Sequence, residues 1–196
     1  MNQVLEWLSG GDIRSDGLSS DVASLVLKNE GLYDELLEGL FVEDDLIRGR
    51  AADALEKVAR LRPDLLVDDL ALLIKVGQED PVPMVRWHIA MIFGHLAPYE
   101  ELTGQLTRTL LDYLQDTSVF VKSWSIVSLC IIGRMYSSEN RRIIEAIIPL
   151  ERDSSVAIRT KVKKAIPLLM NDRMPFPKGW IKSSQAELLV TSATST

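Results

Sequence analysis

The 196 residues are long enough for one domain with its own hydrophobic core. Hydrophobic residues make up 46% and charged residues 26%, and the single cysteine, Cys130, excludes an intrachain disulfide framework or a cysteine-based metal cluster. The net charge of −6 argues against a general nucleic-acid binder, which would usually be basic. Residues 1–116 carry a charge of −12 and residues 117–196 carry +6, so the surface is predicted to be dipolar and able to orient a charged partner.

The N-terminal residues 1–30 are predicted to form capping helices. An amphipathic helix over residues 19–29 begins at the N-cap cluster Ser19-Ser20-Asp21, and residues 2–8 suggest a second, shorter helix. Residues 1–8 lack the basic start and long apolar core of a secretion signal. No apolar run in the chain reaches the ~18 residues needed to cross a bilayer. We therefore expect a soluble, cytoplasmic protein without membrane contact.

A repeat runs through residues 31–171. Four segments share an aliphatic residue, then a basic residue, two variable positions and a small, apolar stretch; they begin at Ile47, Val85, Val121 and Ile158. An aspartate stands five residues before the last three starts, at Asp80, Asp116 and Asp153. Each segment follows another helical stretch, which predicts helix pairs whose second helices lie near residues 46–60, 83–97, 119–135 and 156–170. No sustained alternation predicts a strand.

These residues resemble the HEAT-repeat family, including its PBS-lyase-like members. The resemblance implies an all-α, right-handed α-solenoid of about four to five helix pairs, in which each pair covers the next. It assigns a turn-supporting role to the basic residue of each segment: Arg48, Arg86, Lys122 and Arg159. An exposed basic ladder for phosphates is the alternative. Residues 172–196 are predicted to be a mobile tail, although Phe176 and Trp180 could instead pack on the last helix.

The helical wheel predicts which side chains of the second helices face away from the core. In the HEAT family this direction is the concave face. In this chain, the residues that point in this direction are apolar in the middle and basic toward the end of the chain. The predicted partner-binding residues are Trp87, Met91, Val127, Trp124, His88, Arg134, Lys161 and Lys164. An exposed apolar patch of this kind would indicate an interaction site. Alternatively, solenoid curvature or a folded-back tail buries Trp87 and Met91, and His88, Trp124 and Lys161 merely seal the gap between helices.

The predicted function is a protein-binding scaffold or adaptor that takes an apolar helix or peptide, with a basic end suited to an acidic partner. One alternative is a nucleic-acid-binding or DNA glycosylase-like HEAT protein, and another is an accessory chaperone or lyase-like factor for a cofactor-bearing protein. No phosphate-binding loop or nucleophile motif is found. HEAT-like iron hydroxylases carry paired His-Glu motifs, whereas neither His88 nor His95 is followed by glutamate. No catalytic residue, cofactor or metal is therefore expected.

Overall fold

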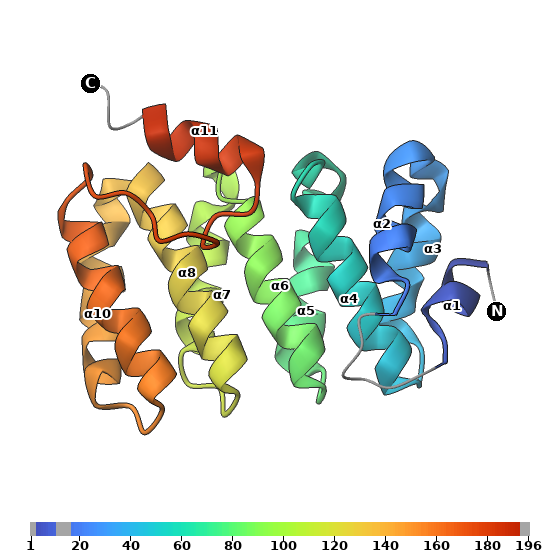
Figure 1. The fold of residues 1–196 in the computed structure, drawn as a ribbon, viewed down its shortest axis with the longest axis horizontal. Coiled ribbons are helices and arrows are strands. Elements are labelled where there is room, and N and C mark those ends of the chain that lie inside the picture. Colours follow the sequence, from blue (N-terminus) through green and yellow to red (C-terminus); the bar gives the residue numbers. More distant parts are fainter. Residues whose placement is uncertain (1–2, 11–16, 193–196) are drawn as a thin grey trace. The chain divides into compact units, whose positions relative to one another are not determined.

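Residues 3–10 and 17–192 are described by the computed structural model, and every regular element among them is a helix (Figure 1). This confirms the predicted all-α class. The chain divides into two compact units, unit 1 with residues 1–92 and unit 2 with residues 93–196. Within the described residues, no helix has the length and apolar character required to cross a membrane.

Unit 1 contains five helices and the greater part of a sixth among its described residues. These are α1 (Gln3–Leu8), α2 (Ser19–Lys28), α3 (Tyr33–Glu38), α4 (Asp45–Ala59), α5 (Leu70–Glu79) and α6 (Pro83–His95), with short 3-10 turns at Glu30–Leu32, Gly39–Phe41 and Pro63–Leu66. Helix α2 packs along α4, and the core is formed by fully buried side chains such as Leu36, Leu55 and Leu73. Helix α4 begins at residue 45 because the Asp44 carboxylate accepts hydrogen bonds from the backbone N–H groups of Leu46 and Ile47.

Unit 2 is built mainly around α8 and α10. Its elements are α7 (Thr103–Tyr113), α8 (Val119–Met135), α9 (Asn140–Ile147), α10 (Val156–Met170) and α11 (Ser184–Ser192), with 3-10 turns at Glu100–Leu102, Ser137–Glu139 and Ile148–Arg152. Helix α8 packs against both α7 and α10. Leu106, Leu110 and Leu129 are completely buried in the core.

The recurring aspartates each close a turn before a long helix. One carboxylate oxygen of Asp80 accepts from the Val82 N–H at 2.7 Å, and Asp116 and Asp153 accept from the N–H groups two residues later in the same way. The helices that follow begin at residues 83, 119 and 156, the positions predicted for them. A local turn signal therefore sets these helix starts.

The structure differs from the prediction of a mobile tail over residues 172–196. Residues 184–192 form α11, whose first turn is capped by the Ser183 hydroxyl accepting from the Ala186 N–H, and α11 packs against α8. Trp180 is only 7% exposed and Val190 2% exposed. Burial of these apolar side chains favours a packed segment over an extended one. Residues 193–196 lie outside the described residues.

Candidate partner-binding surface

The four basic residues after the aliphatic positions contact the turns beside them. The Arg48 guanidinium donates to the carbonyls of Val42 and Glu43 at 2.9 and 2.8 Å, and its Nε lies 2.8 Å from the Asp80 carboxylate. In unit 2, the Lys122 ammonium lies 2.5 Å from the Asp153 carboxylate. Together with the Ser155 N–H, Lys122 holds the pKa of Asp153 below its usual range.

Arg86 and Arg159 make the same contact in different units. Arg86 donates to the carbonyls of Asp80 and Pro81 at 2.8 and 2.9 Å. Arg159 donates to those of Asp153 and Ser154 at 2.7 and 2.9 Å. Such bonds satisfy carbonyls in the turn that no helix partner would reach. The four basic side chains are thus engaged within the chain.

Three of the predicted partner-binding residues lie on α6, and the structure buries two of them. Met91 is 5% exposed and His88 8% exposed, whereas Trp87 is partly exposed. The predictions that Met91 and His88 face a partner are therefore wrong. The run Ile89-Ala90-Met91-Ile92-Phe93 is apolar all round, and a helix of that kind is normally enclosed on every side.

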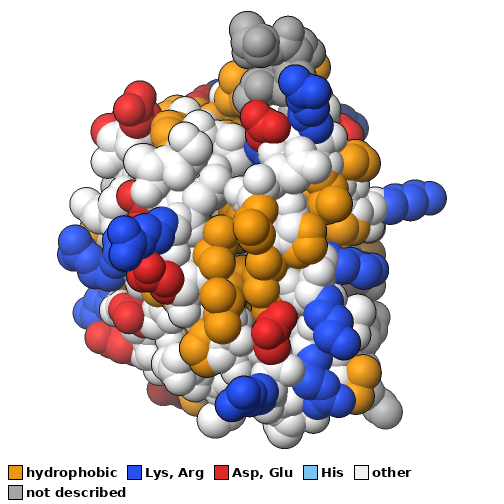
Figure 2. Space-filling model, turned by 90° about the vertical axis from the view of Figure 1, so that its left-hand side faces the viewer, with side chains coloured by type: hydrophobic (Ala, Val, Ile, Leu, Met, Phe, Trp, Pro, Cys, Tyr) orange, Lys and Arg blue, Asp and Glu red, His pale blue; other side chains and the backbone are white. Residues whose placement is uncertain are grey.

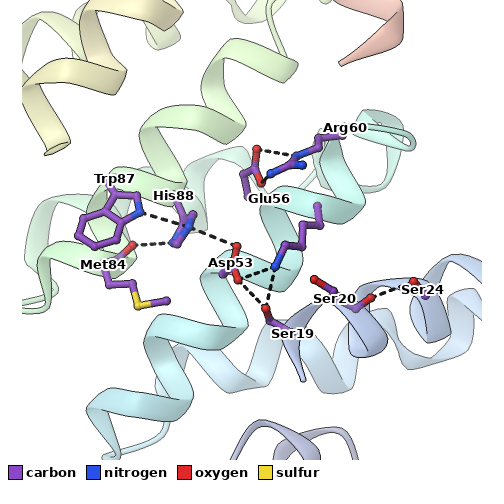
Figure 3. Close-up of polar contacts among 10 residues, drawn as sticks. Ser19, Ser20, Ser24, Asp53, Glu56, Arg60, Met84, Trp87 and His88 are labelled. Carbon is purple, nitrogen blue, oxygen red and sulfur yellow. Dashed lines mark hydrogen bonds and ion pairs between the residues drawn. The ribbon is translucent and has the colours of Figure 1, made fainter. Parts of the chain in front are cut away.

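Trp87 and His88 belong to a polar cluster that also includes Ser19, Asp53 and Lys57, here called the Asp53 cluster (Figure 3). The Ser19 hydroxyl donates to Asp53 Oδ2 at 2.5 Å, and the Lys57 ammonium lies 2.7 Å from the same oxygen and 2.8 Å from Ser19 Oγ. His88 Nε2 lies 3.3 Å from Asp53 Oδ1. Helices α2, α4 and α6 each contribute to this network.

The His88 ring is held from both sides. Its Nδ1 lies 2.9 Å from the Met84 carbonyl, and the Trp87 indole N–H donates to its Nε2 at 3.2 Å. This arrangement suits a neutral ring with its proton on Nδ1, because Nε2 must then accept. Burial lowers the pKa of His88, against the opposing effect of the Asp53 and Glu56 carboxylates.

The Asp53 cluster does not suit nucleophilic catalysis. Ser19 and Lys57 are close enough for a serine–lysine pair, but the Lys57 amine is engaged by the Asp53 carboxylate rather than left to act as a base. Ser19 is also completely buried, so a substrate cannot reach its hydroxyl. Its contacts are those of a structural network.

In unit 2, the middle of the predicted face is buried. Val127 is 1% exposed, and Cys130 is completely buried, which raises the pKa of its thiol. Arg134 is 8% exposed and donates to the carbonyls of Leu168 and Met174 at 3.0 and 2.9 Å. The predictions that Val127 and Arg134 meet a partner are therefore wrong.

The physical reason is that the chain covers this face with its own C-terminal segment, residues 172–192. Arg134 contacts both the end of α10 and this segment. Its guanidinium lies 5.1 Å from the Phe176 ring centre. Phe176 in turn packs edge-on against Trp180. In Figure 1 the segment runs from the end of α10 across α8 to α11.

Two other predicted residues, Trp124 and Lys161, remain partly exposed and meet two residues of the C-terminal segment. We call Trp124, Lys161, Trp180 and Lys182 the tryptophan–lysine cluster. The Lys161 ammonium lies 5.6 Å from the Trp124 ring centre and 4.9 Å from that of Trp180, and the Lys182 ammonium lies 4.6 Å from Trp124. These are cation–π distances.

The tryptophan–lysine cluster is electropositive. Lys161 has no ion pair with a carboxylate in the described part of the chain. Burial lowers the pKa of Lys161, and the nearby Lys164 ammonium acts in the same direction. Lys164, the last of the predicted residues, is exposed on α10. A negative group from a partner would therefore be attracted here.

Sequence reasoning did not assign Trp180 or Lys182 to the site. The available signal was the pair of aromatic residues Phe176 and Trp180, since a large aromatic side chain seldom remains in water when a surface can cover it. Among the described residues, no group of three or more His, Cys, Asp or Glu side chains is arranged to hold a metal ion.

Comparisons with known proteins bear on the fold alone. No protein-family model matches the chain, and no curated protein matches it. A solved crystal structure of an engineered protein is similar, with a TM-score of 0.61 and 15% sequence identity. The match covers 100% of this chain and 86% of the engineered one. At this identity, the likeness indicates a shared arrangement of helices and carries no function.

Proposed function

We propose that this chain is a HEAT-like right-handed α-solenoid of about four to five helix pairs that binds another protein or peptide, as a scaffold or adaptor. The repeat of aspartate and basic residue at corresponding turns supports this architecture, because each copy makes related backbone contacts. Repeat proteins of this kind act through extended surfaces.

One observation carries the binding proposal. Lys161, Lys163 and Lys164 have no ion pair among the described residues; Lys161 belongs to the tryptophan–lysine cluster, whereas Lys163 and Lys164 line a pocket between α10 and the C-terminal segment. Residues 156–182 contain seven Lys or Arg and a single acidic residue, Asp172. Cations beside the partly exposed Trp124 ring suit an acidic partner, since charge steers the encounter and the ring supplies contact area.

The proposal is tested by selecting binders from a displayed peptide library with the full chain as target. We expect selected peptides to be rich in Asp and Glu. Lys164→Glu should weaken the binding of a selected peptide at least about tenfold, equivalent to ~1.4 kcal/mol. The matched control is Lys75→Glu, which makes the same charge change at an exposed lysine of unit 1 and should leave affinity unchanged.

Two outcomes would contradict the proposal. The selection could yield no enriched sequence, or both charge reversals could have the same effect. Circular dichroism of each variant establishes that the helical content is retained, so that a loss of affinity reports the surface rather than unfolding.

Nucleic-acid binding is the second candidate, and the same cations and rings favour it, because bases stack on aromatic side chains. It predicts that a single-stranded oligonucleotide is retained at ~50 mM salt and released as salt rises. Base excision has less support, because the tryptophan–lysine cluster contains no carboxylate that could act on a base.

A further inference from the structure

A pocket of about 350 Å³ lies between the second half of α10 and the start of the C-terminal segment. Five of its lining residues are apolar and two are cationic; they are Pro167, Leu168, Met174, Pro175, Pro177, Lys163 and Lys164. Its size is at the lower end of the about 300–1,000 Å³ that small-ligand sites usually have. It can therefore take a large side chain rather than a whole folded element.

Apolar side chains are also exposed on α10 and on the 3-10 turn that packs against it. Met170, near the end of α10, is 75% exposed, and Ile148, in the 3-10 turn after α9, is 45% exposed. Figure 2, which views the α10 side of unit 2, shows hydrophobic side chains gathered in the middle of this face, with Lys and Arg along one border and Asp or Glu side chains also beside the group. Exposed apolar surface bordered by charge is typical of an interaction site.

Lys163 and Lys164 supply the charge. Both side chains are exposed, and neither forms an ion pair within the described part of the chain. Their ammonium groups stand beside an apolar pocket, so a carboxylate placed there would be attracted without having to displace an internal partner. An occupant that carries negative charge next to an apolar group matches both features.

The backbone adds one polar feature. Pro167 lies inside α10 and has no N–H, so it cannot donate to the Lys163 carbonyl as a helical residue at that position would. Lys163 and Pro167 both line the pocket. The Lys163 carbonyl therefore receives no hydrogen bond from position 167 of the helix.

We propose that this pocket binds a short acidic peptide segment of a partner protein, with one large apolar side chain in the pocket and flanking Asp or Glu side chains on Lys163 and Lys164. The inference rests on the proposed protein-binding function and identifies the chemistry of its partner. Charge complementarity decides the occupant, since a neutral apolar peptide would leave both ammonium groups unused.

Fluorescence anisotropy with labelled synthetic peptides tests the proposal. The first probe is an acidic peptide with one central Phe, the second replaces Phe by Ala, and the third keeps Phe but replaces each Asp and Glu by its amide. We expect the first to bind and the other two to bind at least about tenfold more weakly, because each lacks one of the two matched features.

Protein variants then place the peptide. Pro175→Glu puts a carboxylate on an exposed residue at the rim of the pocket. It should weaken binding of the first peptide at least about tenfold, whereas Lys75→Glu in unit 1 should leave this binding unchanged. Pro167→Ala restores the helical N–H, so it should raise thermal stability while weakening the peptide. The higher thermal stability of Pro167→Ala shows that this variant is folded.

The results separate this inference from the proposed function. Equal binding with Phe or Ala, or no effect of Pro175→Glu, would overturn the pocket assignment while leaving acidic-partner binding in place. Absence of binding by every acidic peptide would remove both. Binding of an oligonucleotide instead, or self-association that Pro175→Glu abolishes in sedimentation, would assign the pocket to nucleic acid or to a second copy and overturn the peptide.

Discussion

The Asp53 cluster of unit 1 and the tryptophan–lysine cluster of unit 2 involve the same position of the repeat, the third residue after the aliphatic start. In unit 1 this position holds Arg50 and His88, and His88 lies 3.3 Å from the Asp53 carboxylate. In unit 2 it holds Trp124 and Lys161, whose ring and ammonium contact each other and two residues of the C-terminal segment. The position is the same, but the neighbouring helices supply different partners.

The difference separates a structural network from a binding surface. In the Asp53 cluster, Lys57 and Asp53 neutralise each other, so this cluster offers little charge to a partner. In unit 2, the cations rest on aromatic faces, which attract an ammonium group without cancelling its charge. Buried ion pairs of the first kind are costly to break, whereas the second kind still attracts anions.

Removing the central carboxylate of the first region should have the largest effect. Asp53→Ala leaves the Lys57 ammonium without its counter-charge in a mostly buried site, and we expect the free energy of unfolding to fall by about 3 kcal/mol. Urea denaturation measures the loss. Asp64→Ala, which breaks an exposed pair with Arg62, is the control and should cost much less. Equal losses would show that the Asp53 cluster has no special structural role.

A smaller effect is expected in the second region. Arg134→Ala removes charged hydrogen bonds to the carbonyls of Leu168 and Met174, so unit 2 should lose about 2 kcal/mol of stability. The C-terminal segment should also open more often, which accelerates tryptic cleavage at Lys178 and Lys182. Arg134→Lys retains the charge but not the planar donor set, so its stability should lie between those of the wild type and Arg134→Ala. Unchanged cleavage in Arg134→Ala would contradict an anchoring role.

The smallest effect concerns pH. Burial lowers the pKa of His88, so between its folded value and the ordinary value of about 6.5 the unfolded chain binds more protons than the folded one. The contribution of His88 to stability is therefore fully present above that ordinary pKa and declines as the pH falls through this window. The charged groups that face His88 are Asp53, Glu56 and Lys57. Urea unfolding at several pH values should show that the free energy of unfolding falls more steeply with decreasing pH for the wild type than for His88→Asn. Identical slopes for the two proteins would refute this role of His88.

Local features of the fold were predictable because they depend on residues a few positions apart. The aspartate turns mark where α6, α8 and α10 begin, since each carboxylate binds a backbone N–H two residues away. The all-helical class follows equally from apolar spacing. The solenoid itself, with its number of helix pairs, stays a proposal.

The site was harder to predict from the same pattern. A helical wheel treats one helix in isolation, so it placed Met91, Val127 and Arg134 on an outward face. The structure buries all three, whereas Trp124 and Lys161 stay accessible. No spacing rule indicated that Phe176 and Trp180 would return to α8 and α10, because that contact joins positions far apart in the chain.

By itself, the sequence determined the helical class, the helix starts and the positive charge of the C-terminal half. Each of these arises from side-chain chemistry and hydrogen bonds within one or two turns of backbone. Only the tertiary structure decided which of the outward side chains meet water. That outcome depends on the C-terminal segment, which buries Trp180 and Val190 on unit 2 and leaves the lysines of α10 beside an open apolar pocket.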